Sequence, residues 1–139
     1  MLSLSALLAV AACGGDDDTN NAPLDWKNLD ATAKGAYMGS TVLSEMTTVF
    51  QAFDATRYAS MNCDTCHGPD GASVMFAMPN PNLPALSATL QDEFTNSSTI
   101  SMFMAGMVVP RMASLLELTP VDPMTGEGEF GCFSCHTMK

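Results

Sequence analysis

The pattern Cys-x-x-Cys-His occurs twice in this chain, and its residue types predict one kind of chemistry. The copies begin at Cys63 and Cys132. Two cysteines three residues apart can form thioethers to the two vinyl groups of one porphyrin, and the adjacent histidine then lies under the ring, where its imidazole can bind iron. The chain has only two histidines, and both stand in these motifs. We therefore expect two covalently attached haem c groups, with attachment at Cys63, Cys66, Cys132 and Cys135 and iron ligation by His67 and His136.

The second axial ligand of each iron is predicted from the donors that remain. No third histidine exists, so bis-histidine ligation within one chain is excluded. Methionine is the obvious alternative, because its thioether favours reduced iron and raises the reduction potential. Among the 12 methionines, most are expected to fill gaps in the core. The first choices are Met46 and Met112, the second choices are Met38 and Met104, and the loop residues Met75 and Met78 compete for the first haem.

The preferred methionines lie in an internal repeat. Residues 37–50 align without a gap with residues 103–116, which lie 66 positions later. In this alignment Tyr37 corresponds to Phe103, which are both aromatic, and Met38 and Met46 correspond to Met104 and Met112. Each segment precedes its own Cys-x-x-Cys-His motif. The chain is therefore predicted to contain two copies of one unit, in which an apolar helix and a connection lead to a haem motif.

The elements that position the ligands are expected to be helices. The predicted fold class is all-α: two repeated helix–loop–Cys-x-x-Cys-His haem-binding units with long loops rich in proline and glycine. The first helix is expected over 31–53 with Asp30 as its N-cap, and Asp54 would cap a second short helix through Tyr58. The second long helix is expected from residue 98 or 99 to Leu118, with a kink or restart at Pro110. Residues 68–96 and 119–131 are predicted to be loops, with one short helix near 86–94, and no segment alternates as a strand does.

The N-terminal residues predict export and a lipid anchor. An apolar run from Leu2 to Ala12 precedes Cys13 and resembles the h-region and lipobox of a bacterial lipoprotein signal, which implies lipidation of Cys13. Residues 1–12 lack the basic n-region of such a signal, so the true start is expected further upstream. The run is too short to span a bilayer, so lipid would be the only membrane attachment. The expected location is the periplasm-facing cell envelope, with the outer membrane slightly favoured because Gly14, and not an aspartate, follows Cys13.

The domain prediction follows from these segments. Residues 1–12 are the signal, residues 13–23 are the lipidated cysteine and a flexible tether rich in Gly, Asp and Asn, and residues 24–139 form a single dihaem cytochrome c domain. Within this domain, unit one covers about 30–70, a loop covers about 71–97, and unit two covers about 98–139.

The charge of the chain restricts its partners. The formal net charge is −10, with only five lysines and arginines, which argues against binding nucleic acid or an anionic membrane surface and favours basic or neutral redox proteins. No small-molecule substrate is expected. Arg57 and Arg111 are candidates for pairing with haem propionates, since guanidinium binds carboxylate well; the alternative is that both are ordinary surface arginines.

The order of an apolar helix with a methionine, a turn and a Cys-x-x-Cys-His motif resembles the haem-binding unit of the tetrahaem cytochrome subunit of photosynthetic reaction centres. The resemblance is carried by Val109-Pro110-Arg111-Met112-Ala113 with residues 131–136, and by Glu45-Met46 with residues 61–67. It implies that the upstream helix supplies the sixth iron ligand. The chain has two units where that subunit has four, and three extra residues precede the second motif. A weaker resemblance to ordinary cytochromes c lies in Cys66-His67-Gly68 and Leu83-Pro84-Ala85-Leu86.

The sequence is compatible with several functions. The leading interpretation is a membrane-tethered periplasmic electron carrier with two His/Met haems and no enzymatic activity. The main alternative is a dihaem peroxidase or a gas-binding or sensing cytochrome, either of which needs an open coordination site on iron. A third interpretation replaces haem with one Zn²⁺ held by four thiolates, although 65 residues between the cysteine pairs is a long separation. Two redox-active disulfides are less favoured, because the thioredoxin-like context is absent.

Overall fold

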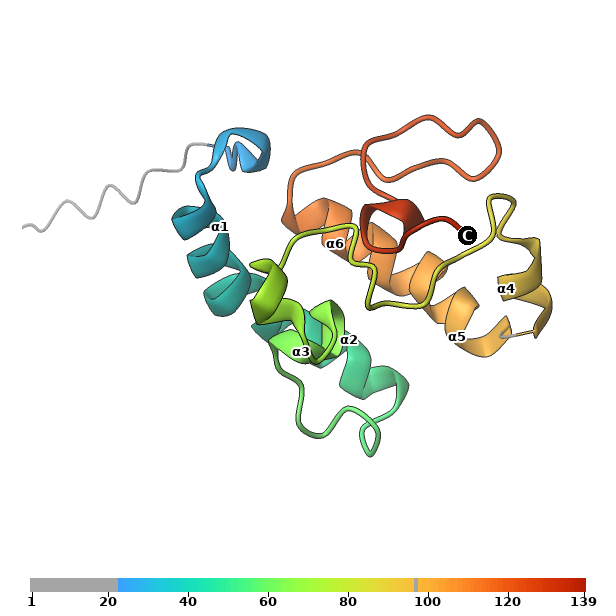
Figure 1. The fold of residues 1–139 in the computed structure, drawn as a ribbon, viewed down its shortest axis with the longest axis horizontal. Coiled ribbons are helices and arrows are strands. Elements are labelled where there is room, and N and C mark those ends of the chain that lie inside the picture. Colours follow the sequence, from blue (N-terminus) through green and yellow to red (C-terminus); the bar gives the residue numbers. More distant parts are fainter. Residues whose placement is uncertain (1–22, 97) are drawn as a thin grey trace, which may run out of the picture.

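The structure is a computed structural model that describes residues 23–96 and 98–139 (Figure 1). Cys13, the predicted signal and nearly all of the predicted tether lie outside these residues. The described part is all-α: it contains helices and isolated β-bridges but no regular strand, as expected. None of the described helices is both long enough and apolar enough to cross a membrane.

The first long helix covers the predicted range. It consists of α1 (Ala31–Tyr37), a π-helical segment η2 (Met38–Val42) and α2 (Leu43–Phe53), which follow one another without a break. The side chain of Asp30 accepts a hydrogen bond from the Ala33 amide at 2.8 Å, so the expected N-cap is confirmed. The helix ends where Asp54 adopts an extended conformation.

The second long helix ends earlier than predicted. It consists of α5 (Ser98–Phe103), a π-helical segment η4 (Met104–Val108) and α6 (Val109–Leu115), which follow one another without a break, and Pro110 lies just after the π-helical segment. The predicted end at Leu118 is wrong because Glu117 takes a left-handed conformation, with φ of 51°. Leu118 N–H then donates to Ala113 O at 2.9 Å, and Glu117 N–H donates to Ser114 O at 3.2 Å, which is the Schellman pattern of a helix C-terminus.

Both helices carry the same interruption. The π-helical segments begin at Met38 and Met104, which occupy equivalent positions of the sequence repeat. Pro110 does not explain this shared feature, because the first helix contains no proline. π-helical turns are rare and are often found at functional sites. The two equivalent π-helical segments are therefore candidates for a functional region.

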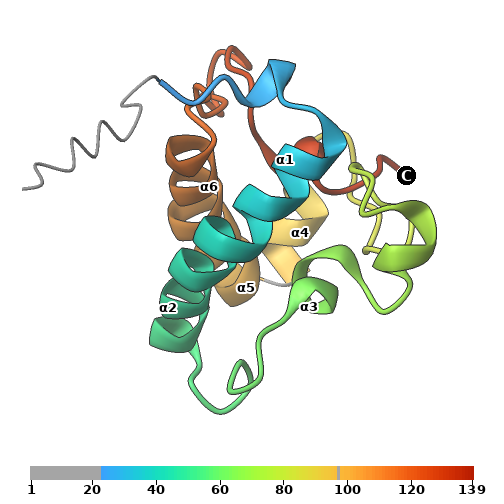
Figure 2. The same cartoon turned by 90° about the vertical axis from the view of Figure 1, so that its left-hand side faces the viewer.

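The two long helices pack antiparallel to each other (Figure 2). The Tyr37 hydroxyl donates to Leu115 O at 2.7 Å, and Phe50 meets Phe103 edge to face with ring centroids 5.1 Å apart. Midway along the pair, Arg111 forms an ion pair with Glu45, 66 residues away. Glu45 and Arg111 are equivalent positions of the repeat, and a contact between equivalent positions occurs where a two-fold axis passes. The helix pair therefore has approximate two-fold symmetry about this ion pair.

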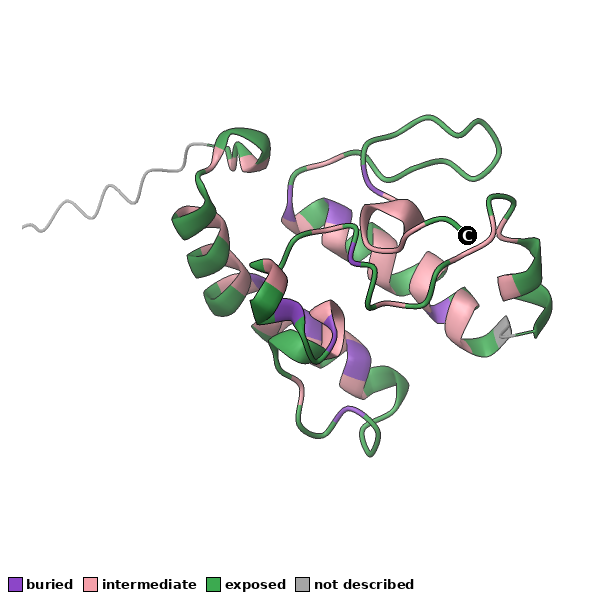
Figure 3. Ribbon diagram, in the orientation of Figure 1, coloured by how far each residue is buried: buried purple, intermediate pink, exposed green. Residues whose placement is uncertain are grey.

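The core lies between the long helices and extends to the segments that precede each cysteine motif (Figure 3). Met46, with 2 % of its surface exposed, is one of the most deeply buried large side chains. Tyr58 and Phe130 enter this core from the connections that lead to the first and second motifs. The buried apolar residues are Val42, Met46, Phe50, Tyr58, Phe103, Ala113, Leu116 and Phe130.

Two predicted short helices differ from the structure. Asp54 accepts hydrogen bonds from the amides of Thr56 and Arg57, but it closes a turn, and no helix runs through Arg57 and Tyr58. The helix predicted near 86–94 is α4 (Gln91–Asn96). It begins later because Leu90 has φ of 58°, which is incompatible with a right-handed helix. The other short helices are η1 (Trp26–Asn28), α3 (Cys63–His67), η3 (Gly71–Val74) and η5 (Cys132–Ser134).

The C-terminal segment runs parallel to the loop that follows the first motif. Asn80 N–H donates to Cys135 O at 3.0 Å, Leu86 N–H donates to Thr137 O at 2.9 Å, and Lys139 N–H donates to Leu86 O at 3.0 Å. The side chains add an ion pair between Lys139 and Glu93 at 3.1 Å. Residues 80–86 thereby place the second motif next to the segment that leaves the first.

Candidate functional site

The two Cys-x-x-Cys-His motifs share one local hydrogen bond that fixes their first turn. In the first motif, which forms α3, the amide of Asn62 donates to the Thr65 hydroxyl at 3.2 Å. In the second motif, which begins with η5, the amide of Gly131 donates to the Ser134 hydroxyl at 3.0 Å. The residue before the second cysteine is a hydroxyl residue in both copies, and its side chain satisfies an N–H group that the short helix leaves free.

The histidine of the second motif is held in the tautomer that can bind a metal. Its Nδ1 lies 2.9 Å from the carbonyl oxygen of Pro84. Because a carbonyl oxygen only accepts hydrogen bonds, Nδ1 of His136 carries a proton, and in the neutral imidazole the Nε2 lone pair is then free for a metal. Pro84 belongs to the loop between the two units, so the segment after the first motif orients the ligand of the second.

The histidine of the first motif has a different environment. His67 Nδ1 is buried and has no hydrogen-bond partner among the described residues, and the Phe76 ring meets the imidazole edge to face at 5.2 Å. Burial lowers the pKa of His67 below its ordinary value, which favours the neutral imidazole. A Cβ at Gly71 would lie 2.7 Å from the Cβ of His67, so the close packing here requires glycine.

Burial disfavours the thiolate form at Cys66, Cys132 and Cys135. Burial raises the pKa of Cys66 to about 11, and it raises the pKa of Cys135 to about 11 with a further contribution from nearby Cys66. Burial also raises the pKa of Cys132. Redox-active cysteine pairs depend on a thiol with a lowered pKa, and burial shifts the pKa of these three thiols in the opposite direction. The interaction between Cys66 and Cys135 also shows that the two motifs are neighbours.

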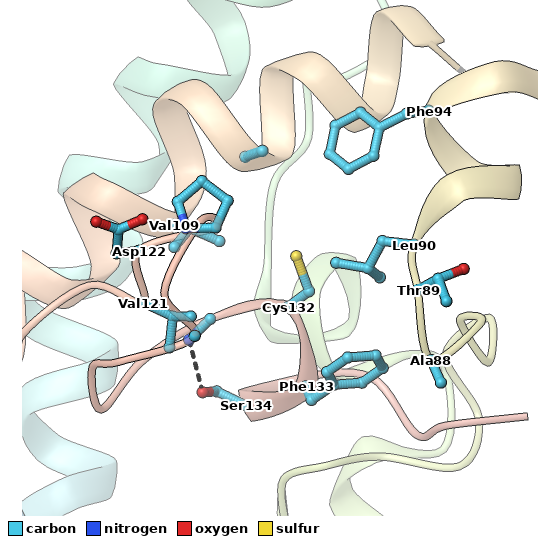
Figure 4. Close-up of a pocket in the computed structure, with 14 residues that line it drawn as sticks. Ala88, Thr89, Leu90, Phe94, Val109, Val121, Asp122, Cys132, Phe133 and Ser134 are labelled. Atoms are coloured by element: carbon cyan, nitrogen blue, oxygen red, sulfur yellow. Dashed lines mark hydrogen bonds between the residues drawn. The ribbon is translucent and has the colours of Figure 1, made fainter.

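A pocket of about 560 Å³ opens against the second motif (Figure 4). Its volume lies in the range of sites that take small molecules and cofactors. The Cys132 sulfur points into it, and the side chains of Val109, Leu90 and Phe94 form apolar walls from three directions. The lining residues are Ala88, Thr89, Leu90, Phe94, Ala105, Val109, Val121, Asp122, Pro123, Gly126, Gly131, Cys132, Phe133 and Ser134.

The first-choice methionines lie at equivalent places in the two long helices, next to the core. Met46 is part of the buried core, and Met112 is half-buried and packs against it. Met112 is three residues after the pocket residue Val109 in α6, so it lies one turn further along the same side of the helix. The second-choice residues Met38 and Met104 are half-buried and begin the two π-helical segments.

The loop methionines that compete for the first haem differ in exposure. Met78 is half-buried, whereas Met75 has 88 % of its surface exposed. Burial therefore favours Met78 over Met75 as the competitor for the first iron.

The two arginines proposed for propionate binding already have partners. Arg111 pairs with Glu45 at the centre of the helix pair, and the Arg57 guanidinium lies 5.5 Å above the centre of the Tyr58 ring. A propionate at either arginine would compete with these contacts.

Two residues that shape the site were not predicted from the sequence. Asn80 is completely buried, and Pro84 supplies the carbonyl that holds His136. Both lie in the segment Met78-Pro79-Asn80-Pro81-Asn82-Leu83-Pro84, whose composition indicates only a loop. Their roles depend on pairing with residues more than 50 positions away, which a local pattern does not encode.

Within residues 23–96 and 98–139, no group of three or more His, Cys, Asp or Glu side chains is arranged to hold a metal ion. Comparisons of the chain with protein-family models, with curated proteins and with solved structures find no match.

Proposed function

We propose that this protein is a periplasmic electron carrier that holds two c-type haems, one at each Cys-x-x-Cys-His motif. The observation that carries the proposal is the arrangement at the second motif. The Cys132 sulfur faces an apolar pocket of about 560 Å³, and the Pro84 carbonyl fixes the proton of His136 on Nδ1. A sulfur for covalent attachment, an apolar space and an imidazole with a free Nε2 are the groups that a c-type haem requires.

At the second motif, Cys132 lines the apolar pocket, whereas Cys135 and His136 are not among its lining residues. Apolar walls from Val109, Leu90 and Phe94 would cover porphyrin faces and exclude water. Cys135 packs against the core, so a thioether at this position would join the porphyrin edge to the centre of the fold. Asp122 is the one acidic residue of the pocket lining and would repel propionates, which would therefore extend away from it.

The first motif supports the proposal through its similarity to the second. Its cysteines have the same spacing, and Thr65 accepts the same backbone hydrogen bond that Ser134 accepts. His67 Nδ1 has no hydrogen-bond partner within residues 23–96 and 98–139, so in this part of the chain its imidazole is less firmly oriented than that of His136. We therefore assign the more rigidly oriented histidine ligand to the second haem.

The iron in each haem would supply reversible one-electron redox chemistry. We propose Met46 and Met112 as sixth ligands, because the repeat makes them equivalent and both helices contain a π-helical segment just before them. A thioether ligand raises the reduction potential, and it fills the coordination position that a substrate or gas would need.

The alternative function, a dihaem peroxidase or a gas-binding cytochrome, is favoured by one observation. Met46 is buried within the helix pair with only 2 % exposure. If this sulfur stays in the core, the first iron keeps an open position unless Met78 occupies it. A single four-thiolate zinc site is disfavoured, because 65 residues separate the two cysteine pairs and a histidine follows each pair.

The cellular setting is part of the proposal. Lipidation at Cys13 would tether the domain to a bacterial membrane facing the periplasm, with other redox proteins as partners. The net charge is −10, and haem propionates would make it more negative. This charge would favour partners with a basic or neutral docking face, and the rate of association with a basic partner would fall as the salt concentration rises.

The proposed function predicts two reversible one-electron steps. The protein should be produced in a host with haem-attachment machinery and titrated between its oxidised and reduced states while the haem absorption is followed. We expect two low-spin haems that do not bind carbon monoxide rapidly in the reduced state. A high-spin haem with rapid carbon monoxide binding would support the alternative function, and a protein without haem would contradict both.

A further inference from the structure

Asn80 is a polar residue that is completely buried, with 0 % exposure, and its contacts involve both motifs. Its side-chain Nδ2 donates to His67 O at 2.6 Å. Its backbone N–H donates to Cys135 O at 3.0 Å. Its Oδ1 accepts from the Asn82 amide at 2.8 Å, which fixes the orientation of the side-chain amide. One residue therefore contacts the last residue of the first motif and the second cysteine of the other.

These contacts reach the backbone that carries both predicted iron ligands. His67 O belongs to the first histidine itself, and Cys135 O belongs to the peptide that joins Cys135 to His136. The same loop continues to Pro84, whose carbonyl accepts from His136 Nδ1. Hydrogen bonds to groups behind a metal ligand set its orientation and basicity, so a change at Asn80 is transmitted to both histidines.

We propose that Asn80 is a positioning residue that couples the two histidine-bearing motifs, so that each haem site senses the state of the other through residues 80–84. The inference rests on the proposed function for its redox consequences, but its structural part concerns only the polypeptide. A buried amide without partners is costly. Asparagine at this position is explained by its side chain, since Nδ2 donates to His67 O and Oδ1 accepts from the Asn82 amide. The bond to Cys135 O comes from the backbone N–H of residue 80.

The chain provides a matched control two residues away. Asn82 has the same side chain in the same loop but is exposed, and its backbone amide, not its side chain, contacts Asn80. Leucine resembles asparagine in size and lacks hydrogen-bonding atoms in its side chain. Comparing Asn80→Leu with Asn82→Leu therefore isolates the two buried side-chain hydrogen bonds of Asn80 from a general effect of leucine in this loop. The backbone N–H that donates to Cys135 O is present in both variants.

The redox test measures the midpoint potentials of both haems in the full chain. We expect Asn80→Leu to change the reduction equilibrium of both haems by about tenfold each, which is about 59 mV for a one-electron step, and Asn82→Leu to change neither. A shift confined to one haem, or no shift with both haems attached, would overturn the coupling. If Asn80→Leu fails to mature, the smaller and still polar Asn80→Ser variant decides by the same criterion.

A second readout does not require haem. Amide hydrogen exchange in the full chain should become about tenfold faster at both Gly68 and His136 in Asn80→Leu, because these amides close the last turns of the two motifs. Faster exchange in only one motif would contradict the proposal. This measurement separates the two hypotheses: a wild-type protein without haem would disprove the proposed function, and the exchange data would still decide whether Asn80 couples the motifs.

Discussion

Alanine at both Cys132 and Cys135 is expected to remove one of the two proposed haems and to leave the other attached. The reason is that each motif has its own two cysteines and its own histidine, which is the full residue set proposed for one attachment site. The measurement is the haem content per chain after conversion to the pyridine haemochrome. The double variant Cys63→Ala with Cys66→Ala should give the same loss from the other site.

The pair of double variants also distinguishes haem from zinc. A four-thiolate zinc site needs both cysteine pairs around one ion, so either double variant would lose all of the metal and not half. Asp64→Asn serves as a control, since it changes an exposed position inside the first motif while keeping the cysteines and histidine. Retention of both haems in a double cysteine variant, or loss of both, would contradict independent attachment.

If Met112 binds iron as proposed, Met112→Leu is expected to remove the sulfur–iron charge-transfer absorption of one oxidised haem and to lower the reduction potential of that haem. Leucine keeps most of the methionine volume, and such exchanges cost less than about 1.5 kcal/mol in a core, so the spectral change reports ligation and not unfolding. Met46→Leu should have the same effect on the other haem. Alanine at Met46 would be a poorer probe, because a cavity at this buried position costs about 2–5 kcal/mol.

The second-choice methionines provide the control for this test. Met38→Leu and Met104→Leu change half-buried residues in the π-helical segments that precede the helices containing Met46 and Met112. Both variants should leave the absorption spectra of the two haems unchanged. If Met104→Leu lowers a potential and Met112→Leu does not, the ligand assignment is wrong although the haem proposal stands. If Met78→Leu acts in place of Met46→Leu, the first iron is bound from the loop after its own motif.

Local patterns predicted the long helices well. Apolar spacing and Asp30 gave the first helix its full range, Ala31–Phe53. The end of the second helix was placed three residues too late because Glu117 adopts a left-handed conformation, in which glycine is the usual residue. Nothing in the pattern predicted the π-helical segments, although the repeat that contains them was visible in the sequence.

The sequence predicts the cysteines and histidines of the candidate site, and their roles in haem attachment and iron ligation stay predictions. The spacing of cysteine and histidine identifies the motifs directly, because that chemistry is local. The pocket, the Pro84 carbonyl and the buried Asn80 come from the pairing of residues 80–86 with the C-terminal segment. That pairing depends on tertiary packing between segments far apart in the chain, whereas the local composition of residues 80–86 predicts only a loop.

The most direct test of the central claim is the mass of the intact chain produced with haem-attachment machinery, followed by mass mapping of its proteolytic peptides. The account predicts a mass increase equal to two haem groups, one on the peptide containing residues 63–67 and one on the peptide containing residues 132–136. A chain with the mass of the bare polypeptide, free of haem at both motifs, would contradict it.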